Sequence, residues 1–569
     1  MNVEYLAIAK LFLPEIVLTV GALLLLGIDL CLGKRDTRRA LVLLGAVISL
    51  AAACVALLQW DWRPAEAQYV RQAAVTSAVQ RMAPAVGRDA LTHAARISER
   101  DARAVTTAYK AARHDSLVES AATPPADGAP VMGIAPYDAG LSSPSFSAWW
   151  LFTADNFALI FKAIFALALA LALLLSTRFP VARYRGEFAA LLMFAAVGLM
   201  VMVGSLDLVG IFLGLELASL CCYALAAWHK QDARSAEAGT KYLLLGSLAS
   251  AIFIYGASLF FVEYGSTHLH VLAHGAAQSP LTLVALLMVL VSFLFKVAGA
   301  PFHLWAPDVY QGAPTAMVAF LSTAGKAAGF AVLVRVLSAH GFQAFSEKWL
   351  LLFIGVAALS ILIGNLVAIH QNNVKRLLAY SGVAQAGYVL IGLVAMADPA
   401  GGTLLNEALP LTAFIFYLAA YMVMNIGAFA VVGIVGRESG GEELSAFAGL
   451  RARAPVLAFA FTLLLLSLGG IPLLSGFVGK WYLFLAGVYQ GQYLLVLIGT
   501  TMSVVSMYYY LLVIKQMYIL PAADGAQPIR VGALAAAGLA AITLVTVAIG
   551  IYPGPLYTLA QAAAKSLMP

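Results

Sequence analysis

The chain has 569 residues, of which 62% are hydrophobic and only 11% are charged. Soluble domains average about 45–50% apolar and about 25% charged residues, so this composition excludes a soluble protein and indicates a polytopic membrane protein. The net charge of +6 does not indicate nucleic acid as a partner, because the basic residues lie in short loops between apolar segments.

The N-terminus, "MNVEYLAIAKLFLPEIVLTV", has neither a basic n-region nor a small-residue cleavage site, so we interpret it as a retained first helix. Apolar runs of about 20 residues, enough to cross a bilayer, predict an all-α integral membrane protein with fourteen transmembrane helices. The runs fall near 10–32, 40–60, 152–177, 186–205, 207–228, 239–263, 281–300, 315–338, 348–369, 374–396, 411–436, 455–487, 493–517 and 530–552.

Residues 61–150 interrupt this pattern with a polar segment rich in Ala and Arg. Its middle, about 68–113, is predicted to form polar helices, and "SAATPPADGAP" near its end is typical of a disordered linker. Two interpretations stay open for this segment: a non-essential insertion on the periplasmic side, or an element that docks a partner.

Basic residues predict the orientation of the helices, because short cytoplasmic loops carry an excess of Lys and Arg. Alternate loops are basic, whereas the short loops between them contain almost no Lys or Arg. The basic loops are "GKRDTRR" (33–39), "TRFPVARYR" (177–185), "HKQDARSAE" (229–237), "NNVKR" (372–376) and "GRESGGEELSAFAGLRARAP" (436–455). The basic loops therefore lie on the cytoplasmic (or matrix/stromal) side and both termini on the opposite side. We expect a multi-pass protein of the bacterial cell inner membrane, in which both termini are periplasmic.

Two similar segments indicate internal repetition. "VAGAPFHLW" (297–305) and "SLGGIPLLSGFVGKWY" (467–482) each place G-x-P inside an apolar span. They predict two five-helix repeats of inverted topology with discontinuous seventh and twelfth helices, an arrangement typical of transporters. The predicted parts are 1–60 (helices 1 and 2), 61–150 (insertion), 151–185 (helix 3), 186–338 (repeat 1), 348–517 (repeat 2) and 518–569 (helix 14 and the C-terminus).

Charged residues inside the apolar spans are the main candidates for function, since each costs roughly 2.5–3.5 kcal/mol to insert. They are Glu216, Lys296, Lys326 and Lys480, with Lys241 as a less clear member near a polar loop. Burial disfavours the charged form of a lysine and a nearby carboxylate favours it. A change in the distance between Lys296 and Glu216 would therefore switch the lysine between proton-loaded and proton-empty states. The alternatives are a static buried ion pair and a side chain that snorkels toward the membrane interface.

Prolines next to these lysines predict helix breaks. Pro301 and Pro472 free backbone carbonyls one turn earlier, and in lipid those carbonyls need another partner, for which we expect water in a polar cavity. A simple packing kink is the alternative. His303, just past the first break, is a candidate proton relay or a buried histidine with ordinary bonding.

Other polar residues of the spans do not predict a cofactor or metal. Four cysteines lie in apolar segments without a CxxC pair, so iron–sulfur, zinc or c-type haem ligation has no support, and we expect no cofactor and no metal on this chain. The histidine spacing of "HLHVLAH" resembles a metal site, but no acidic cluster accompanies it, so we do not expect it to bind a metal. Glu15 and Asp29 are interpreted as packing or assembly features. The residues concerned are Cys31, Cys54, Cys221, Cys222, His268, His270 and His274.

Several motifs together resemble a known family. "LPEI", "FKVAGAPFHLWAPDVYQGAPT", "VKRLLAYSGVAQAGY" and "GGIPLLSGFVGK" are similar to the antiporter-like membrane subunits of respiratory complex I (NADH–quinone oxidoreductase), and to subunit N in particular. The resemblance covers roughly 1–60 and 151–569, and the string "PFHLWAPDVYQGAPT" is highly specific. A lysine on the twelfth helix disfavours subunit M, and the absence of a long C-terminal lateral helix disfavours subunit L.

The resemblance implies roles for individual residues. Glu216, Lys241, Lys296, Lys326 and Lys480 match the charged residues of helices 5, 6, 7, 8 and 12 in the proton path of that family. FMN, iron–sulfur clusters and quinone would then be bound by partner subunits, and the partners of this chain would be other complex I membrane subunits, the lipid bilayer and protons. Gln385 stands where the family usually has a histidine, and a glutamine bonds water but does not carry the proton itself.

Three functions are compatible with the sequence. The first is a proton-translocating subunit of NADH–quinone oxidoreductase, whose redox steps occur in partner subunits. The second is a subunit of an Mrp-type Na⁺/H⁺ antiporter, which shares the Glu/Lys arrangement. The third is a structural subunit that only anchors its neighbours, and four ionisable groups inside the membrane argue against it because an anchor gains nothing from their cost.

Overall fold

The computed structural model describes residues 12–32, 38–59, 151–176, 185–274, 279–338, 346–397, 408–522 and 526–567. The predicted insertion at 61–150, with its polar helices and linker, lies outside the described residues. The side chains of Asp29, His270 and His274 also lie outside them.

The described ranges contain helices and loops but no β-strand, and their only bridges are three isolated pairs. The first helices are α2 (Leu13–Leu32), α3 (Arg38–Leu58), α7 (Asn156–Ser176), α8 (Arg185–Gly204), α9 (Leu208–Ala226), α10 (Ala233–Tyr264), α11 (Leu269–His274), α12 (Pro280–Lys296), α13 (Trp305–Gly312), α14 (Thr315–Phe320), the π-helix η2 (Leu321–Gly325) and α15 (Lys326–Leu337). They are followed by α16 (Ser346–Ala368), α17 (Val374–Val394), α18 (Leu409–Ser439), the 3-10 helix η4 (Leu444–Phe447), α19 (Leu450–Arg453), α20 (Pro455–Gly469), α21 (Ser475–Tyr489), α22 (Tyr493–Tyr518), α23 (Ala533–Ile551) and α24 (Gly554–Leu567). The prediction of an all-α protein is confirmed.

Eleven helical segments of the described chain are long and apolar enough to cross a membrane. Three shorter apolar helices, α2, α12 and α20, lie at further predicted spans. The count of fourteen spans and the inverted relation of the two repeats stay predictions. The sequence analysis missed α24, because its alanines and polar residues do not form a long apolar run.

Local chemistry explains where several of these helices begin and end. Side chains of the residue before the helix accept hydrogen bonds from backbone N–H groups of the first turn, which otherwise have no partner. Glycines in the left-handed conformation end α10 and α18, at Gly265 and Gly440. The capping residues of α9, α10, α12 and α17 are Asp207, Asp232, Ser279 and Asn373.

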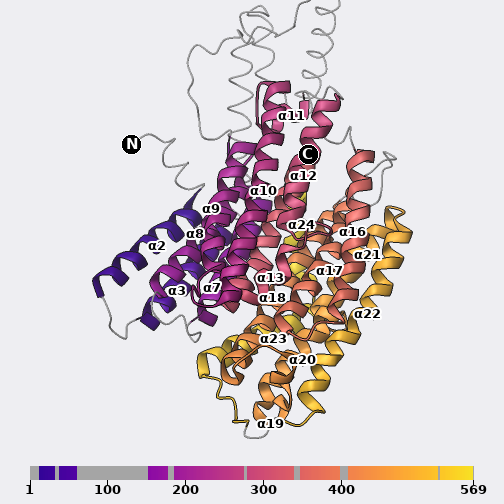
Figure 1. Ribbon diagram of the computed structural model, residues 1–569. Coiled ribbons are helices and arrows are strands. Elements are labelled where there is room, and N and C mark those ends of the chain that lie inside the picture. The colour runs from indigo at the N-terminus through magenta and orange to yellow at the C-terminus, as the bar shows by residue number, and fades with distance from the viewer. Residues whose placement is uncertain are drawn as a thin grey trace, which may run out of the picture. The chain divides into compact units, whose positions relative to one another are not determined.

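The helices differ in how far the protein itself buries them. Every residue of the most apolar stretch of the segment Thr315–Leu337 is buried, as is 94% of that stretch in α17 and in α18, but only 17% in α23. In Figure 1, α16 and α17 lie side by side, and α22 packs beside them. Many exposed residues of α2, α3, α10 and α22 are large and apolar. An exterior of this kind fits a hydrocarbon environment.

Two glycines let α9 approach α8 closely. A Cβ atom on Gly198 would lie 2.6 Å from the carbonyl oxygen of Gly214, and a Cβ atom on Gly214 would lie 2.6 Å from that of Gly198. Larger residues would separate the two helices, so the glycines position α9, the helix that carries Glu216.

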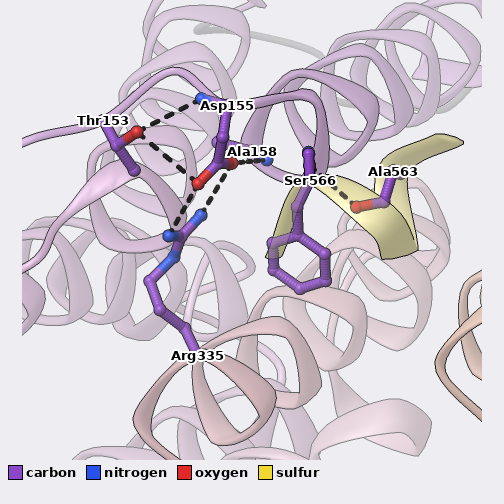
Figure 2. Close-up of polar contacts among 7 residues, drawn as sticks. Thr153, Asp155, Ala158, Arg335, Ala563 and Ser566 are labelled. Atoms are coloured by element: carbon purple, nitrogen blue, oxygen red, sulfur yellow. Dashed lines mark hydrogen bonds and ion pairs between the residues drawn. The ribbon is translucent and has the colours of Figure 1, made fainter. Parts of the chain in front are cut away.

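The start of α7 is bonded to two helices that are distant in the sequence (Figure 2). Asp155 caps α7, since its Oδ1 accepts a hydrogen bond from the backbone N–H of Ala158 at 2.7 Å. The guanidinium of Arg335 on α15 donates two hydrogen bonds to the same carboxylate, at 2.9 and 3.0 Å. The hydroxyl of Ser566 on α24 accepts a bond from the N–H of Phe157. Helix α7 therefore connects α15 with the C-terminal helix.

A second ion pair on α7 is almost fully buried. Nζ of Lys162 lies 2.5 Å from Oε1 of Glu15 on α2, and the two side chains are 1% and 5% exposed. Glu15, for which the sequence indicated packing or assembly, thus ties α2 to α7. The sequence analysis missed Lys162 and Arg335, although both lie inside predicted apolar spans.

Candidate functional site

Glu216 lies in the middle of α9, and its carboxylate is bonded by the next helix. The hydroxyl of Ser250 on α10 donates a hydrogen bond to Oε1 of Glu216. Glu216 is half-buried, with exposed leucines on either side of it along α9. Its carboxylate therefore lies near the outer surface of the helix bundle and not in the bundle core.

Lys296 is the last residue of α12 and is 5% exposed. Its Nζ donates a hydrogen bond to Oγ of Ser219 on α9 at 3.0 Å. One turn earlier, the hydroxyl of Ser292 donates to the carbonyl oxygen of Ala249 on α10 at 2.8 Å, which brings α12 close to α10.

A small cavity lies beside Lys296. Its wall includes Lys296, Ser219, Tyr223 and Ser250, the last of which bonds Glu216. Among the described residues Glu216 and Lys296 form no direct ion pair, and each is bonded to a serine of this wall instead. The hydroxyl groups of Ser219 and Ser250 therefore lie in one cavity wall, the first bonded to Lys296 and the second to Glu216.

The chain is not helical between α12 and α13, where Pro301 lies. We expected water to bind the carbonyls that this break frees, but donors of the chain itself reach two of them. The indole N–H of Trp305 donates to the carbonyl oxygen of Phe295 at 2.9 Å, and the N–H of Gly299 donates to that of Leu294 at 2.9 Å. The chain turns back sharply here, with Ala298 at a φ of +59°, and this turn brings both donors to the end of α12.

Lys326 is the first residue of α15 and directly follows the π-helix η2. It is 2% exposed, and its Nζ donates to the carbonyl oxygen of Gly382 on α17 at 2.6 Å. Asn425 on α18 donates to the hydroxyl of Ser322 in η2 at 2.9 Å. Single π-turns within α-helices are frequent at functional sites, and this one sets the direction in which Lys326 leaves its helix.

The second break lies between α20 and α21, at Pro472, and the side chain of Lys480 on α21 bonds the end of α20. Its Nζ donates to the carbonyl oxygens of Leu468 and Gly469 at 3.0 and 3.1 Å, and to the hydroxyl of Ser503 on α22 at 3.0 Å. At this break too we expected water, whereas the lysine itself bonds the carbonyls at the end of α20. Lys480 is only 3% exposed.

The buried lysines of the described chain fall into two groups. Some are neutralised by carboxylates: Lys162 by Glu15 at 2.5 Å and Lys375 by Glu442 at 3.5 Å. The others are Lys296, Lys326 and Lys480, which we call the lysine row. Within the part of the chain that the structure describes, the row bonds hydroxyl and carbonyl oxygens and forms no ion pair. A static salt bridge therefore does not account for its burial.

Lys241 lies apart from the lysine row. Its side chain is 42% exposed and forms ion pairs with Glu237 and Asp308, both at 2.6 Å. Asp308 in turn binds Arg376 at the start of α17. The predicted role of Lys241 in a proton path stays a prediction, and in this structure it joins α10 to α13.

His303 and Gln385 occupy different surroundings. His303 lies in the first break, is 6% exposed, and its Nδ1 has no hydrogen-bond partner among the described residues. Gln385 on α17 is 2% exposed, and its Nε2 donates to the carbonyl oxygen of Leu468 at 3.1 Å, the same oxygen that Lys480 binds. The hydroxyl of Tyr417 on α18 donates to Oε1 of Gln385.

The sequence analysis did not identify the neutral groups that hold the charged side chains. Ser219 follows Glu216 by about one helical turn, so helical spacing would have found it. Ser250, Ser503 and Tyr417 have no such signal, because each contacts its partner across a helix interface.

A comparison with protein families adds independent information. Residues 205–506, more than half of the chain, match the model described as "NADH:quinone oxidoreductase/Mrp antiporter, TM". The match includes Glu216 and the whole lysine row. The chain belongs to this family. It is therefore a multi-pass membrane protein, and the resemblance seen in the sequence motifs is confirmed.

Curated relatives of the NADH:quinone oxidoreductase/Mrp antiporter family carry two related names. NADH-quinone oxidoreductase subunit N of Desulfitobacterium hafniense is 44% identical over 428 residues, which cover 73% of this chain and 86% of the relative. NAD(P)H-quinone oxidoreductase subunit 2 of Prochlorococcus marinus is 46% identical over 376 residues, which cover 65% of this chain and 69% of the relative.

Solved structures support the same fold. A chain of respiratory complex I from Thermus thermophilus is 27% identical with a TM-score of 0.68, and the match covers 96% of this chain and 98% of that one. A chain of the Mrp complex from Dietzia sp. is 24% identical with a TM-score of 0.63, and covers 72% of this chain and 83% of that one. At this identity, the similarity to the Mrp chain supports a shared fold and nothing more.

Proposed function

We propose that this chain is a proton-translocating membrane-arm subunit of an NADH–quinone oxidoreductase. The observation that carries the proposal is the lysine row, whose three buried side chains bond neutral oxygens instead of carboxylates. A buried lysine without a carboxylate partner releases its proton far more readily than an ion-paired one. The relatives named as subunits N and 2 of quinone oxidoreductases support the choice of enzyme.

In the proposed path, protons pass along the charged residues of the two repeats. The charge of Glu216 acts on Lys296 across the cavity whose wall holds Ser219 and Ser250. Movement of Glu216 toward Lys296 stabilises the charged lysine, and movement away favours loss of its proton. The proton then continues to Lys326 and Lys480.

Further features of the proposal follow from the sequence. The chain has fourteen spans in two inverted repeats, and both termini are periplasmic in a bacterial inner membrane. Its partners are the other membrane subunits of the enzyme. NADH oxidation and quinone reduction take place on those partner subunits, which bind FMN, iron–sulfur clusters and quinone. Lys241 and His303 are accessory members of the path, at its edge and next to the first break.

The second candidate is a subunit of an Mrp-type Na⁺/H⁺ antiporter. The description of the matching family names this class, and the fold of the Dietzia Mrp chain is similar. The higher identity to quinone oxidoreductase subunits favours the first function. Sodium-dependent transport by the chain in cells that lack the oxidoreductase would favour the antiporter instead.

The decisive experiment is Lys296→Ala in the assembled complex, with proton pumping and NADH oxidation measured together in the same vesicles. We expect proton transfer through this subunit to slow by roughly 100-fold, since the variant removes a proton-carrying group from the path. Assembly should persist, because Lys296 has no carboxylate partner whose charge would be left uncompensated.

Lys515→Ala is the matched control, because this lysine is exposed near the end of α22 and lies outside the lysine row. It should pump as the parent does. If Lys296→Ala assembled and kept both normal pumping and normal coupled turnover, the proposed role of the lysine row would be wrong.

A second test uses the glycine that accommodates Lys326. A Cβ atom on Gly382 would lie 2.9 Å from Nζ of Lys326, so Gly382→Ala should push the ammonium away from the carbonyl it binds. We expect pumping through this subunit to slow by about tenfold, since proton transfer requires donor and acceptor within hydrogen-bond reach. Proton uptake by vesicles containing the complex measures the effect.

Gly355→Ala is the control for this test. Gly355 is also helical, but a Cβ atom there would meet nothing within 4 Å. Its replacement should leave pumping unchanged. Equal pumping rates in the two variants would show that the position of Lys326 against α17 is unimportant.

A further inference from the structure

A neutral amide occupies position 385, where α17 passes between Lys326 and Lys480. Gln385 occupies this position, and it shares the carbonyl oxygen of Leu468 with Lys480. An amide bonds water and hydroxyl groups but does not bind and release a proton at neutral pH. Proton transfer between the two lysines therefore needs other groups near Gln385.

Two tyrosines of α18 line this region. Tyr417 and Tyr421 are one helical turn apart, and their rings stack with centroids 6.4 Å apart at an angle of 15°. Both are buried, with 0% and 4% exposure. Tyr417 bonds Oε1 of Gln385, so its hydroxyl lies on the side of α18 that faces α17.

The hydroxyl of Tyr421 lies beside the ammonium of Lys326. A Cβ atom on Gly382 would be 2.9 Å from Nζ of Lys326 and 3.3 Å from the Tyr421 hydroxyl, so both atoms flank the same point. This hydroxyl is buried and has no hydrogen-bond partner among the described residues. Because both atoms lie within 3.3 Å of one point, a single water molecule is large enough to bond both of them.

A buried hydroxyl without a partner costs about 1–3 kcal/mol. Phenylalanine would fill nearly the same space without that cost, so packing alone does not explain a tyrosine at position 421. The hydroxyl of Tyr417, one turn away on the same helix, does have a hydrogen-bond partner, which is Oε1 of Gln385. The free hydroxyl next to Lys326 therefore indicates a group that exchanges hydrogen-bond partners.

We propose that Tyr421 and Tyr417 form a hydroxyl relay that carries protons between Lys326 and Lys480 in place of a titratable residue at position 385. This inference rests on the proposed function. Gln385 acts as a positioning residue, because it holds the Tyr417 hydroxyl and the carbonyl that Lys480 binds.

The proton balance of the relay is simple. Protonated Lys326 gives one proton from Nζ through a bridging water to the oxygen of Tyr421, which passes its own hydroxyl proton on. Tyr417 accepts a proton and releases one in the same way, and water carries it to neutral Lys480, which becomes protonated. Each hydroxyl gains one proton and loses one, so no tyrosinate forms and the only net change is the transfer from Lys326 to Lys480.

Tyr421→Phe and Tyr417→Phe in the assembled complex test the relay. Each removes one hydroxyl, and we expect proton transfer through this subunit to slow by about tenfold or more, with an altered solvent deuterium isotope effect on pumping. Tyr482→Phe is the matched control: it makes the same change on α21, the helix of Lys480, at a half-buried ring that packs on Phe416. The control should pump as the parent does.

A rescue experiment separates a relay from a structural role. Gln385→His in the Tyr421→Phe background places a titratable group between the two lysines, and we expect it to restore most of the lost pumping. Failure of the histidine to restore pumping in an assembled Tyr421→Phe complex would mean that the hydroxyl matters only for packing, which overturns the relay.

Lys480→Met in the same preparation distinguishes failure of the relay from failure of the proposed function. Loss of pumping in Lys480→Met with normal pumping in both tyrosine variants would overturn the relay and leave the proposed function standing. Normal pumping in all three variants would overturn both. Slowed pumping in Tyr510→Phe alone would move the path to α22, where Tyr510 lies 2.5 Å from Ser381, and would also overturn the relay on α18.

Discussion

Arg335→Leu is expected to lower the free energy of unfolding by about 3–5 kcal/mol, because it removes a buried guanidinium that is paired with the carboxylate of Asp155. The guanidinium is 3% exposed and the carboxylate 20% exposed, so water replaces the lost partner only in part. Two hydrogen bonds between them are lost, at 2.9 and 3.0 Å. The midpoint of thermal unfolding of the purified protein in detergent measures the effect.

The double variant Asp155→Asn with Arg335→Leu separates the charge from the fold. Asparagine caps a helix as well as aspartate does, so α7 keeps its first hydrogen bond while the negative charge at position 155 is removed. We expect the double variant to be more stable than Arg335→Leu alone. Arg451→Leu, at an exposed arginine of α19, is the control and should change stability little. Equal stability of Arg335→Leu and the control would contradict a stabilising role for this ion pair.

Lys480→Met should abolish most proton transfer through this subunit while the complex still assembles. The carbonyls of Leu468 and Gly469 each keep one donor after the change, from Gln385 and Ser503. The break between α20 and α21 therefore stays satisfied, and the variant removes mainly the ionisable group. We expect a slowing of roughly 100-fold, measured as protons moved per NADH oxidised.

Lys480→Arg tests whether Lys480 acts by binding and releasing a proton or only as a fixed positive charge. Arginine keeps the charge and the donors but does not release a proton under physiological conditions. We therefore expect the arginine variant to fail in pumping as the methionine variant does. Normal pumping with arginine at this position would show that Lys480 acts through its charge alone.

Much of the site was predictable because the bilayer penalises charge. Lys296, Lys326 and Lys480 stand out from apolar runs by composition alone, and the structure places all of them in buried positions. The apolar runs also predicted roughly where the long helices lie, whereas the caps Asp207 and Ser279, which begin α9 and α12, were found only in the structure.

The partners of these residues were not predictable, because they come from helices far away in the sequence. Lys326 bonds a carbonyl of α17, and no pattern in the chain marks Gly382 as its acceptor. The sequence indicated water at both breaks but did not indicate Trp305 and Lys480, which donate to the carbonyls there. Local sequence shows that a carbonyl is freed but not which donor the folded chain brings to it.

The sequence by itself determined that this is an all-α membrane protein with lysines buried in broken or interrupted helices. Composition and periodicity were sufficient, since lipid contact requires long apolar runs and makes a charge within them costly. Only the tertiary structure decided which buried cations are neutralised and which are not. Lys162 and Arg335 face carboxylates while the lysine row does not, and this difference depends on side chains that meet across helix interfaces.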